Sequence, residues 1–154
     1  MSSIPLPAPL PVLLVAAHRL LVDALHHMIE TDEDCIVVGK ATAMNEVVAL
    51  LPTARPSFII ADLDSSHGLN IALAEELAKR AADIPIIALT CHIGVDHLYQ
   101  LLPFQFQALL TKDIDGQEFI RVLKMLKDGG GAKNFVTLHY QQFTTEKGRF
   151  NFLN

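Results

Sequence analysis

The sequence has no long apolar run, few cysteines and no excess of positive charge, and each absence excludes a class of protein. No apolar stretch reaches the roughly 20 residues that a transmembrane helix needs. A net charge of −5 over 154 residues gives no electrostatic footprint for nucleic acid, so we do not expect these residues alone to bind DNA. With only two cysteines, Cys35 and Cys91, we expect reduced thiols and a cytoplasmic location.

The motifs of cofactor and metal sites are also missing. No glycine-rich loop follows the first apolar run, which argues against a bound nucleotide or flavin. His92 and His97 are five residues apart, and no cysteine or carboxylate at a recognisable spacing completes a tetrahedral metal site. We therefore expect no resident cofactor and do not expect an enzyme.

What the sequence does contain is an alternation of short apolar runs with amphipathic stretches. Hydrophobic residues make up 51% of the chain and charged residues 19%, as in a folded globule. Five apolar runs have the length of buried strands: 12–16, 35–39, 57–61, 84–89 and 108–111. Helical patterns follow them at 20–29, 42–51, 69–82, 94–102 and 115–128, with caps expected from Thr42 and from Asp115 with Glu118.

Five strands, each followed by a helix, predict an α/β protein with one parallel sheet and helices on both faces. Right-handed crossovers leave few ways to wind such a sheet, and the order 2-1-3-4-5 is the common five-stranded solution. We therefore predict a three-layer, flavodoxin-like fold.

Sites in such a sheet form beyond the carboxyl ends of the strands, where the strand order reverses. The residues leaving those ends here are Ala16, Ala17, Asp62, Thr90 and Lys112. An acid, a hydroxyl and an ammonium in one cleft would suit a phosphoryl group, which Asp62 could accept, Thr90 could hydrogen-bond and Lys112 could neutralise. A purely structural Asp–Lys pair is the alternative.

Taken in order, these motifs resemble the receiver (CheY-like) domains of two-component response regulators, in particular the LuxR/NarL type. The resemblance covers about residues 12–131. It implies that Asp62, within Ile59-Ile60-Ala61-Asp62-Leu63, is the phosphoacceptor and that Thr90 is the switch threonine. It also implies that Lys112, followed by Asp113, is the lysine that contacts the phosphate.

Departures from this family bear on the mechanism. The family carries two acidic residues before a histidine at the end of its first strand and uses them to hold Mg²⁺; here Ala16 and Ala17 precede His18. We therefore doubt that Mg²⁺ binds, because the ion prefers several oxygen ligands. Leu109 stands where the family has its switch aromatic residue. Asp64 is a possible substitute acid, but we expect its side chain to point away or into a loop.

Three functions remain open at this point. The first is an atypical pseudo-receiver that acts in phosphorelay signalling by protein–protein contact and dimerises through its fourth-helix to fifth-helix face or its tail. The second is a working receiver phosphorylated on Asp62, and the third is a flavodoxin-like module that binds a small molecule. Expected partners are a second copy of the chain and a histidine kinase or another signalling protein, with no membrane and with DNA only through an output domain.

We divide the chain into a proline-rich leader at 1–11, the receiver domain at 12–131 and a tail at 132–154. The tail holds five of the ten aromatic residues, which is more than a passive linker needs. We expect it to pack on its own domain or on a second copy, or to lead toward an output domain that would regulate transcription.

Overall fold

The computed structural model describes residues 4, 8–91, 94–128, 135–137, 142–146 and 149–153. Its main elements alternate along the chain between strand and helix. They are β1 (Leu10–Val15), α1 (Arg19–Glu30), β2 (Cys35–Ala41), α2 (Met44–Ala54), β3 (Phe58–Asp62), α3 (Ile71–Arg80), β6 (Ile86–Thr90), α4 (Val95–Leu101), β7 (Ala108–Thr111) and α5 (Gly116–Asp128). The predicted alternation is confirmed, with helix and strand ends shifted by a few residues.

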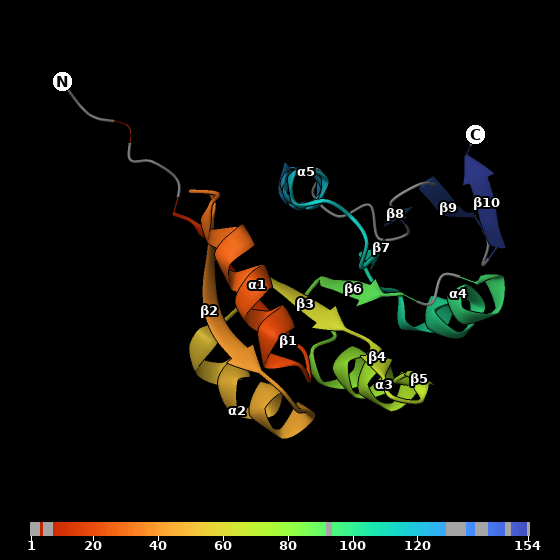
Figure 1. Cartoon of the computed structure of the whole chain (residues 1–154), viewed down its shortest axis with the longest axis horizontal. Helices are drawn as coiled ribbons and strands as arrows, with labels where there is room; N and C mark the ends of the chain where they lie inside the picture. Colours follow the sequence, from red (N-terminus) through yellow and green to blue (C-terminus); the bar gives the residue numbers. More distant parts are fainter. Residues whose placement is uncertain are drawn as a thin grey trace.

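The five main strands form one parallel sheet in the order β2-β1-β3-β6-β7 (Figure 1). This is the predicted 2-1-3-4-5 arrangement. In the register Val15 lies beside Ala61, and Asp62 lies beside Leu89. The carboxyl ends of β1, β3 and β6 therefore meet at the same edge of the sheet.

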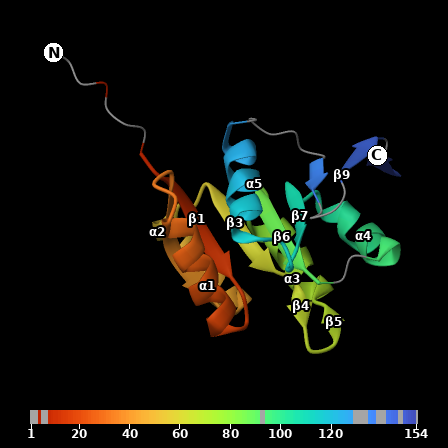
Figure 2. The same cartoon turned by 45° about the horizontal axis from the view of Figure 1, so that its top comes forward.

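Helices cover both faces of this sheet (Figure 2). Helices α1 and α5 pack on one face around the fully buried Phe119 and Ile29, whereas α2, α3 and α4 pack on the other around Val47 and Leu77. Every residue of β3, β6 and β7 is buried, which explains why these strands read as continuous apolar runs and do not alternate.

Helix α2 differs from its predicted form at both ends. It continues past Pro52 to Ala54, because a proline in the last turn removes one backbone hydrogen bond without preventing the turn. At the other end, Thr42 does not cap the helix with its side chain. Its amide and hydroxyl instead both donate to the Glu46 carboxylate, at 3.1 and 3.0 Å.

Half of the capping box expected for α5 is present. The Glu118 amide donates to the Asp115 carboxylate at 2.8 Å, while the Glu118 carboxylate pairs with Arg121 at 3.1 Å. The other helices and strands are close to their predicted ranges. After α4, a 3₁₀ turn at Leu102–Phe104 accommodates Pro103.

Strand β1 begins at Leu10, two residues before the predicted start, and includes Pro11. Proline is tolerated near the start of a strand, and here the Pro11 carbonyl accepts from the Ser57 amide at 2.8 Å. The remainder of the predicted leader lies mostly outside the described residues. Among the helices that the structure describes, none has the length and apolar character to cross a membrane.

Two small sheets were not predicted. A hairpin of β4 (Asp64–Ser65) and β5 (Gly68–Leu69) follows β3 directly. In the tail, β8 (Phe135–Thr137), β9 (Gln142–Glu146) and β10 (Arg149–Leu153) form an antiparallel sheet. The packing that we predicted for the tail aromatics concerns side chains outside the described part of the chain.

Candidate functional site

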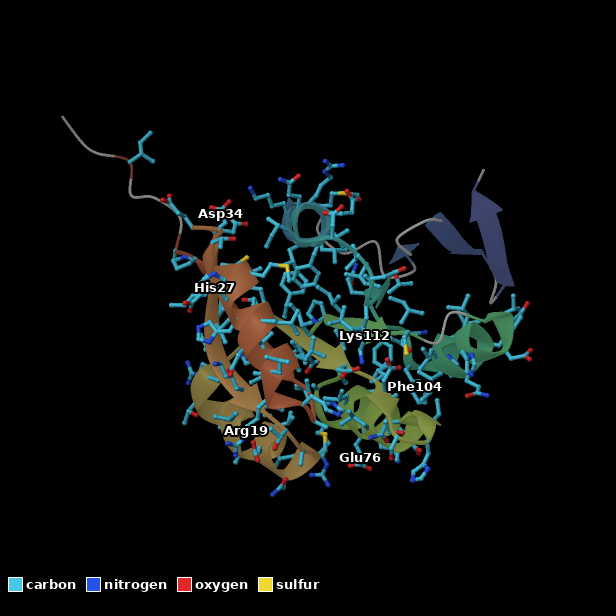
Figure 3. All side chains as sticks on the ribbon, in the orientation of Figure 1. Arg19, His27, Asp34, Glu76, Phe104 and Lys112 are labelled. Carbon is cyan, nitrogen blue, oxygen red and sulfur yellow. The ribbon has the colours of Figure 1, made fainter. Side chains whose placement is uncertain are left out.

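Asp62, Thr90 and Lys112 lie together at the carboxyl edge of the sheet. Asp62 ends β3, Thr90 ends β6 and Lys112 follows β7 directly. The Lys112 ammonium lies 2.7 Å from Asp62 Oδ1, and the Asp62 side chain is only 1% exposed. Figure 3 labels Lys112 near the ends of β3 and β6. The structure thus brings together the three side chains that the sequence placed in one cleft.

Lys112 contacts a second carboxylate as well. Its Nζ lies 2.8 Å from Asp64 Oδ2, so one ammonium bridges two acids. Burial works against the charged form of Lys112, but its contacts with Asp62 and Asp64 outweigh this effect and raise its pKa. Lys112 is therefore firmly cationic at neutral pH, and its charge is shared between two anions.

The expectation that Asp64 points away from the cleft is wrong. Its carboxylate is 10% exposed and accepts the Thr90 hydroxyl on Oδ1 at 2.6 Å and the Cys91 amide on Oδ2 at 2.8 Å. Burial favours the protonated acid, but the bonds from Lys112, Thr90 and Cys91 prevail and lower the pKa of Asp64 from 3.8 to about 2. Asp64, which the sequence analysis considered as a substitute acid and then set aside, is thus an ionised member of the site.

The β4–β5 hairpin explains how Asp64 reaches the cleft. The backbone amide of Asp64 donates to Asp62 Oδ1 at 3.0 Å, and this bond holds the chain in a turn directly after the end of β3. Asp64 then pairs with Leu69, and the Ser65 hydroxyl donates to the Gly68 carbonyl at 2.9 Å. Gly68 has φ +106°, a conformation that favours glycine. In the sequence, the Ser65–Gly68 segment is therefore the feature that could have predicted this tight turn.

Ala16 and Ala17 follow β1 at the same edge. Ala16 is buried and Ala17 is exposed, and the Ala16 amide donates to the Ala41 carbonyl at 3.0 Å. Because Val15 is in register with Ala61, the end of β1 lies next to the end of β3 that carries Asp62. The two alanines contribute methyl groups and no side-chain oxygen atoms to this edge.

Most of the carboxylate oxygens at this site are already bound by the protein's own donors, which disfavours a tightly held Mg²⁺. One buried atom, Asp62 Oδ2, has no hydrogen-bond partner among the described residues and could serve as a ligand. The other Asp62 oxygen and both Asp64 oxygens already bind Lys112, Thr90 or backbone amides. Among the residues described, no group of three or more His, Cys, Asp or Glu is placed to hold a metal. Magnesium is usually held by one or two carboxylates together with waters and substrate oxygens, and it would have to compete here with Lys112, Thr90 and backbone amides for every acidic oxygen except Asp62 Oδ2.

The remaining residues singled out from the sequence have structural positions. Leu109 is buried among the side chains on the α2–α4 face of the sheet. Cys35 is buried and Cys91 is exposed, and the two cysteines do not form a disulfide. The neighbouring Asp64 carboxylate raises the pKa of the Cys91 thiol, which opposes formation of a reactive thiolate.

This arrangement is that of a receiver domain, and the chain belongs to the response regulator receiver domain family, whose model matches residues 12–124. Among curated proteins, the transcriptional activator DevR/DosR of Mycobacterium tuberculosis is 28% identical over 125 residues, which cover 81% of this chain and 56% of that protein. LiaR of Bacillus subtilis is 25% identical over 118 residues, which cover 77% of this chain and 56% of that protein. The chain thus spans about half the length of the curated relatives it matches.

Solved structures agree on the fold. The RcsB response regulator of Salmonella typhimurium superposes with a TM-score of 0.72 at 20% identity, over 85% of this chain and 63% of that one. A LuxR-family response regulator from Aurantimonas gives a TM-score of 0.68 at 19% identity, over 79% of this chain and 86% of that one. The predicted receiver fold and the likeness to LuxR/NarL-type regulators are confirmed. The roles assigned to Asp62, Thr90 and Lys112 remain predictions.

Proposed function

We propose that this domain is a pseudo-receiver, which signals by contact with other proteins and does not accept a phosphoryl group efficiently on Asp62. The observation that carries this proposal is the pair of alanines, Ala16 and Ala17, at the strand end beside Asp62. The family resemblance places two acidic metal ligands at these positions.

The charge balance of the cleft supports the proposal. Phosphorylation would form a bond between an Asp62 oxygen and phosphorus and break the bond from phosphorus to the donor's leaving oxygen. Negative charge spreads over the phosphoryl oxygens during transfer and must be neutralised nearby. Lys112 is the cation in contact with Asp62, and it already compensates the charge of Asp64 as well. An incoming phosphate would therefore face two carboxylates and one shared ammonium.

Acetyl phosphate tests this proposal directly. We expect no stable phosphoryl adduct on the wild-type chain by intact-mass spectrometry, with or without magnesium, because the cleft lacks the ligands for the ion. Asp62→Asn is the matched control, since it removes the candidate phosphoacceptor with little change in shape. A magnesium-dependent adduct that appears in the wild type and not in Asp62→Asn would establish the rival function, a working phosphoacceptor.

We further propose that the contact surface includes the exposed side of α4 and that its partner is a second copy of the chain. Val95 and Tyr99 lie one helical turn apart there and are 52% and 50% exposed. RcsB, a structural relative, has been solved as dimers bound to DNA. Regulation of transcription would then depend on an output domain, with a histidine kinase or another cytoplasmic signalling protein upstream.

Replacing Tyr99 tests the dimer. Tyr99→Glu should weaken self-association at least about tenfold in sedimentation equilibrium, because it buries a charge in an apolar contact. Leu20→Glu is the matched control, because Leu20 is 84% exposed on α1, on the opposite face of the sheet. Equal loss of association in both variants, or a monomeric wild type, would contradict the proposed surface.

A further inference from the structure

We propose that the Asp64 carboxylate is a built-in substitute for the phosphoryl group, which holds Thr90, Cys91 and Lys112 as a phosphate on Asp62 would hold them. This inference rests on the proposed pseudo-receiver function and extends it, because it assigns the signalling state of the domain. The domain would be held permanently in the conformation that a phosphoryl group on Asp62 would otherwise stabilise, without phosphoryl transfer.

The chemistry of the contacts supports the substitution. A phosphoryl group on Asp62 would present anionic oxygens to a hydroxyl, a backbone amide and an ammonium. Asp64 presents its two carboxylate oxygens to one group of each kind. Oδ1 accepts from the Thr90 hydroxyl at 2.6 Å, and Oδ2 accepts from the Cys91 amide and Lys112, both at 2.8 Å. The hydrogen-bond donors that would recognise a phosphoryl group therefore already bind the Asp64 carboxylate.

The β4–β5 hairpin keeps Asp64 in this position. The bond of 3.0 Å from its amide to Asp62 Oδ1 ties it to the candidate phosphoacceptor, and its pairing with Leu69 fixes the backbone on the other side. With the Asp64 side chain only 10% exposed, water competes little for its oxygens. The carboxylate is thus preorganised by the fold.

The contacts of Asp64 with Thr90 and Cys91 lie just before α4, which carries the proposed signalling surface. Thr90 is the last residue of β6 and Cys91 the first beyond it, and α4 begins shortly afterwards at Val95. A bond to the Cys91 amide therefore fixes the chain at the point where it leaves the sheet toward α4. Loss of the Asp64 carboxylate should release this connection.

The test removes the carboxylate and then supplies an anion. In Asp64→Ala, amide hydrogen exchange at Cys91 should become at least about tenfold faster, because the amide loses its acceptor. Added inorganic phosphate or acetate should slow this exchange again, because the vacated donors can bind a free oxyanion. Neither anion should change exchange in the wild type. Asp83→Asn, an exposed aspartate before β6, is the surface control.

Cysteine reactivity gives a second measurement on a milder variant. In Asp64→Asn the amide keeps the size of the side chain and removes its charge, so Cys91 should react faster with iodoacetamide at neutral pH. The buried Cys35 does not compete for the reagent. Unchanged exchange and alkylation would overturn the proposal, and so would faster exchange that neither anion reverses, because Asp64 would then be a structural ligand only. Phosphorylation of the wild type on Asp62 would instead refute the pseudo-receiver function, so the two failures are distinguishable.

Discussion

Lys112→Met should lower the free energy of unfolding by about 3 kcal/mol, because removing one partner of a buried ion pair leaves an uncompensated charge. Lys112 lies within 2.8 Å of both Asp62 and Asp64, and the two carboxylate side chains are 1% and 10% exposed. Methionine keeps much of the volume of the lysine stem and removes the charge, so packing is largely preserved. Urea unfolding followed by circular dichroism measures the change.

The pH dependence of this variant should be opposite to that of the wild type. In the wild type the pKa of Asp64 is lowered from 3.8 to about 2, so its stabilising contribution is complete above 3.8 and is lost as the pH falls toward 2. Without Lys112, the two carboxylates face each other and the folded chain takes up a proton more readily than the unfolded chain. Lys112→Met should therefore gain stability from about pH 7 to about pH 5, where the wild-type contribution of Asp64 is constant.

A double-mutant cycle separates the ion pair from the loss of the lysine itself. In the Asp62→Asn background, Lys112→Met should lower the free energy of unfolding markedly less than in the wild type, because one of the two buried carboxylates that it leaves without a cation is gone. Equal costs in both backgrounds, or a loss below about 0.5 kcal/mol in the wild type, would show that the bridge contributes little to stability.

The sequence was sufficient for the sheet because each buried strand is an uninterrupted apolar run. Such runs as 57–61 and 108–111 also place the residue after the strand at the carboxyl edge, so the sequence alone is enough to predict that Asp62 and Lys112 lie together. Their 2.7 Å contact follows from the register of β3, β6 and β7. Prediction succeeded where position along a strand alone determines where a side chain lies.

Asp64 could not be placed in this way. Its direction depends on a hairpin only a few residues long, whose strands are too short for any hydrophobic pattern. It also depends on the Thr90 hydroxyl and the Cys91 amide, which come from a different strand end. A position determined by such long-range hydrogen bonds leaves no periodic signal in the sequence. The extension of α2 past Pro52 was missed for a related reason, since only the surrounding packing decides whether a last turn forms.

Acidic residues at positions 16 and 17 should turn the proposed pseudo-receiver into an efficient phosphoacceptor. The variant Ala16→Asp/Ala17→Asp/Asp64→Ser places two carboxylates at the strand end beside Asp62 and frees Thr90 and Lys112 from Asp64. With magnesium and acetyl phosphate, we expect labelling of Asp62 at least about 100-fold above the wild type, the scale of an electrostatic contribution to a transition state. Intact-mass spectrometry measures the adduct.

Variants that carry only part of the change show whether labelling of Asp62 depends on the new carboxylates, on the removal of Asp64, or on both. Ala16→Asp/Ala17→Asp alone should bind magnesium, seen as a rise in melting temperature with the ion, but should accept phosphate poorly because Asp64 still occupies the donors. Asp64→Ser alone should free the donors and show no response to magnesium. Aspartate at the buried Ala16 position should itself lower stability, and magnesium should recover part of that loss. If the triple variant folds and still shows neither magnesium binding nor labelling, the alanine pair does not account for the proposed loss of phosphoryl transfer.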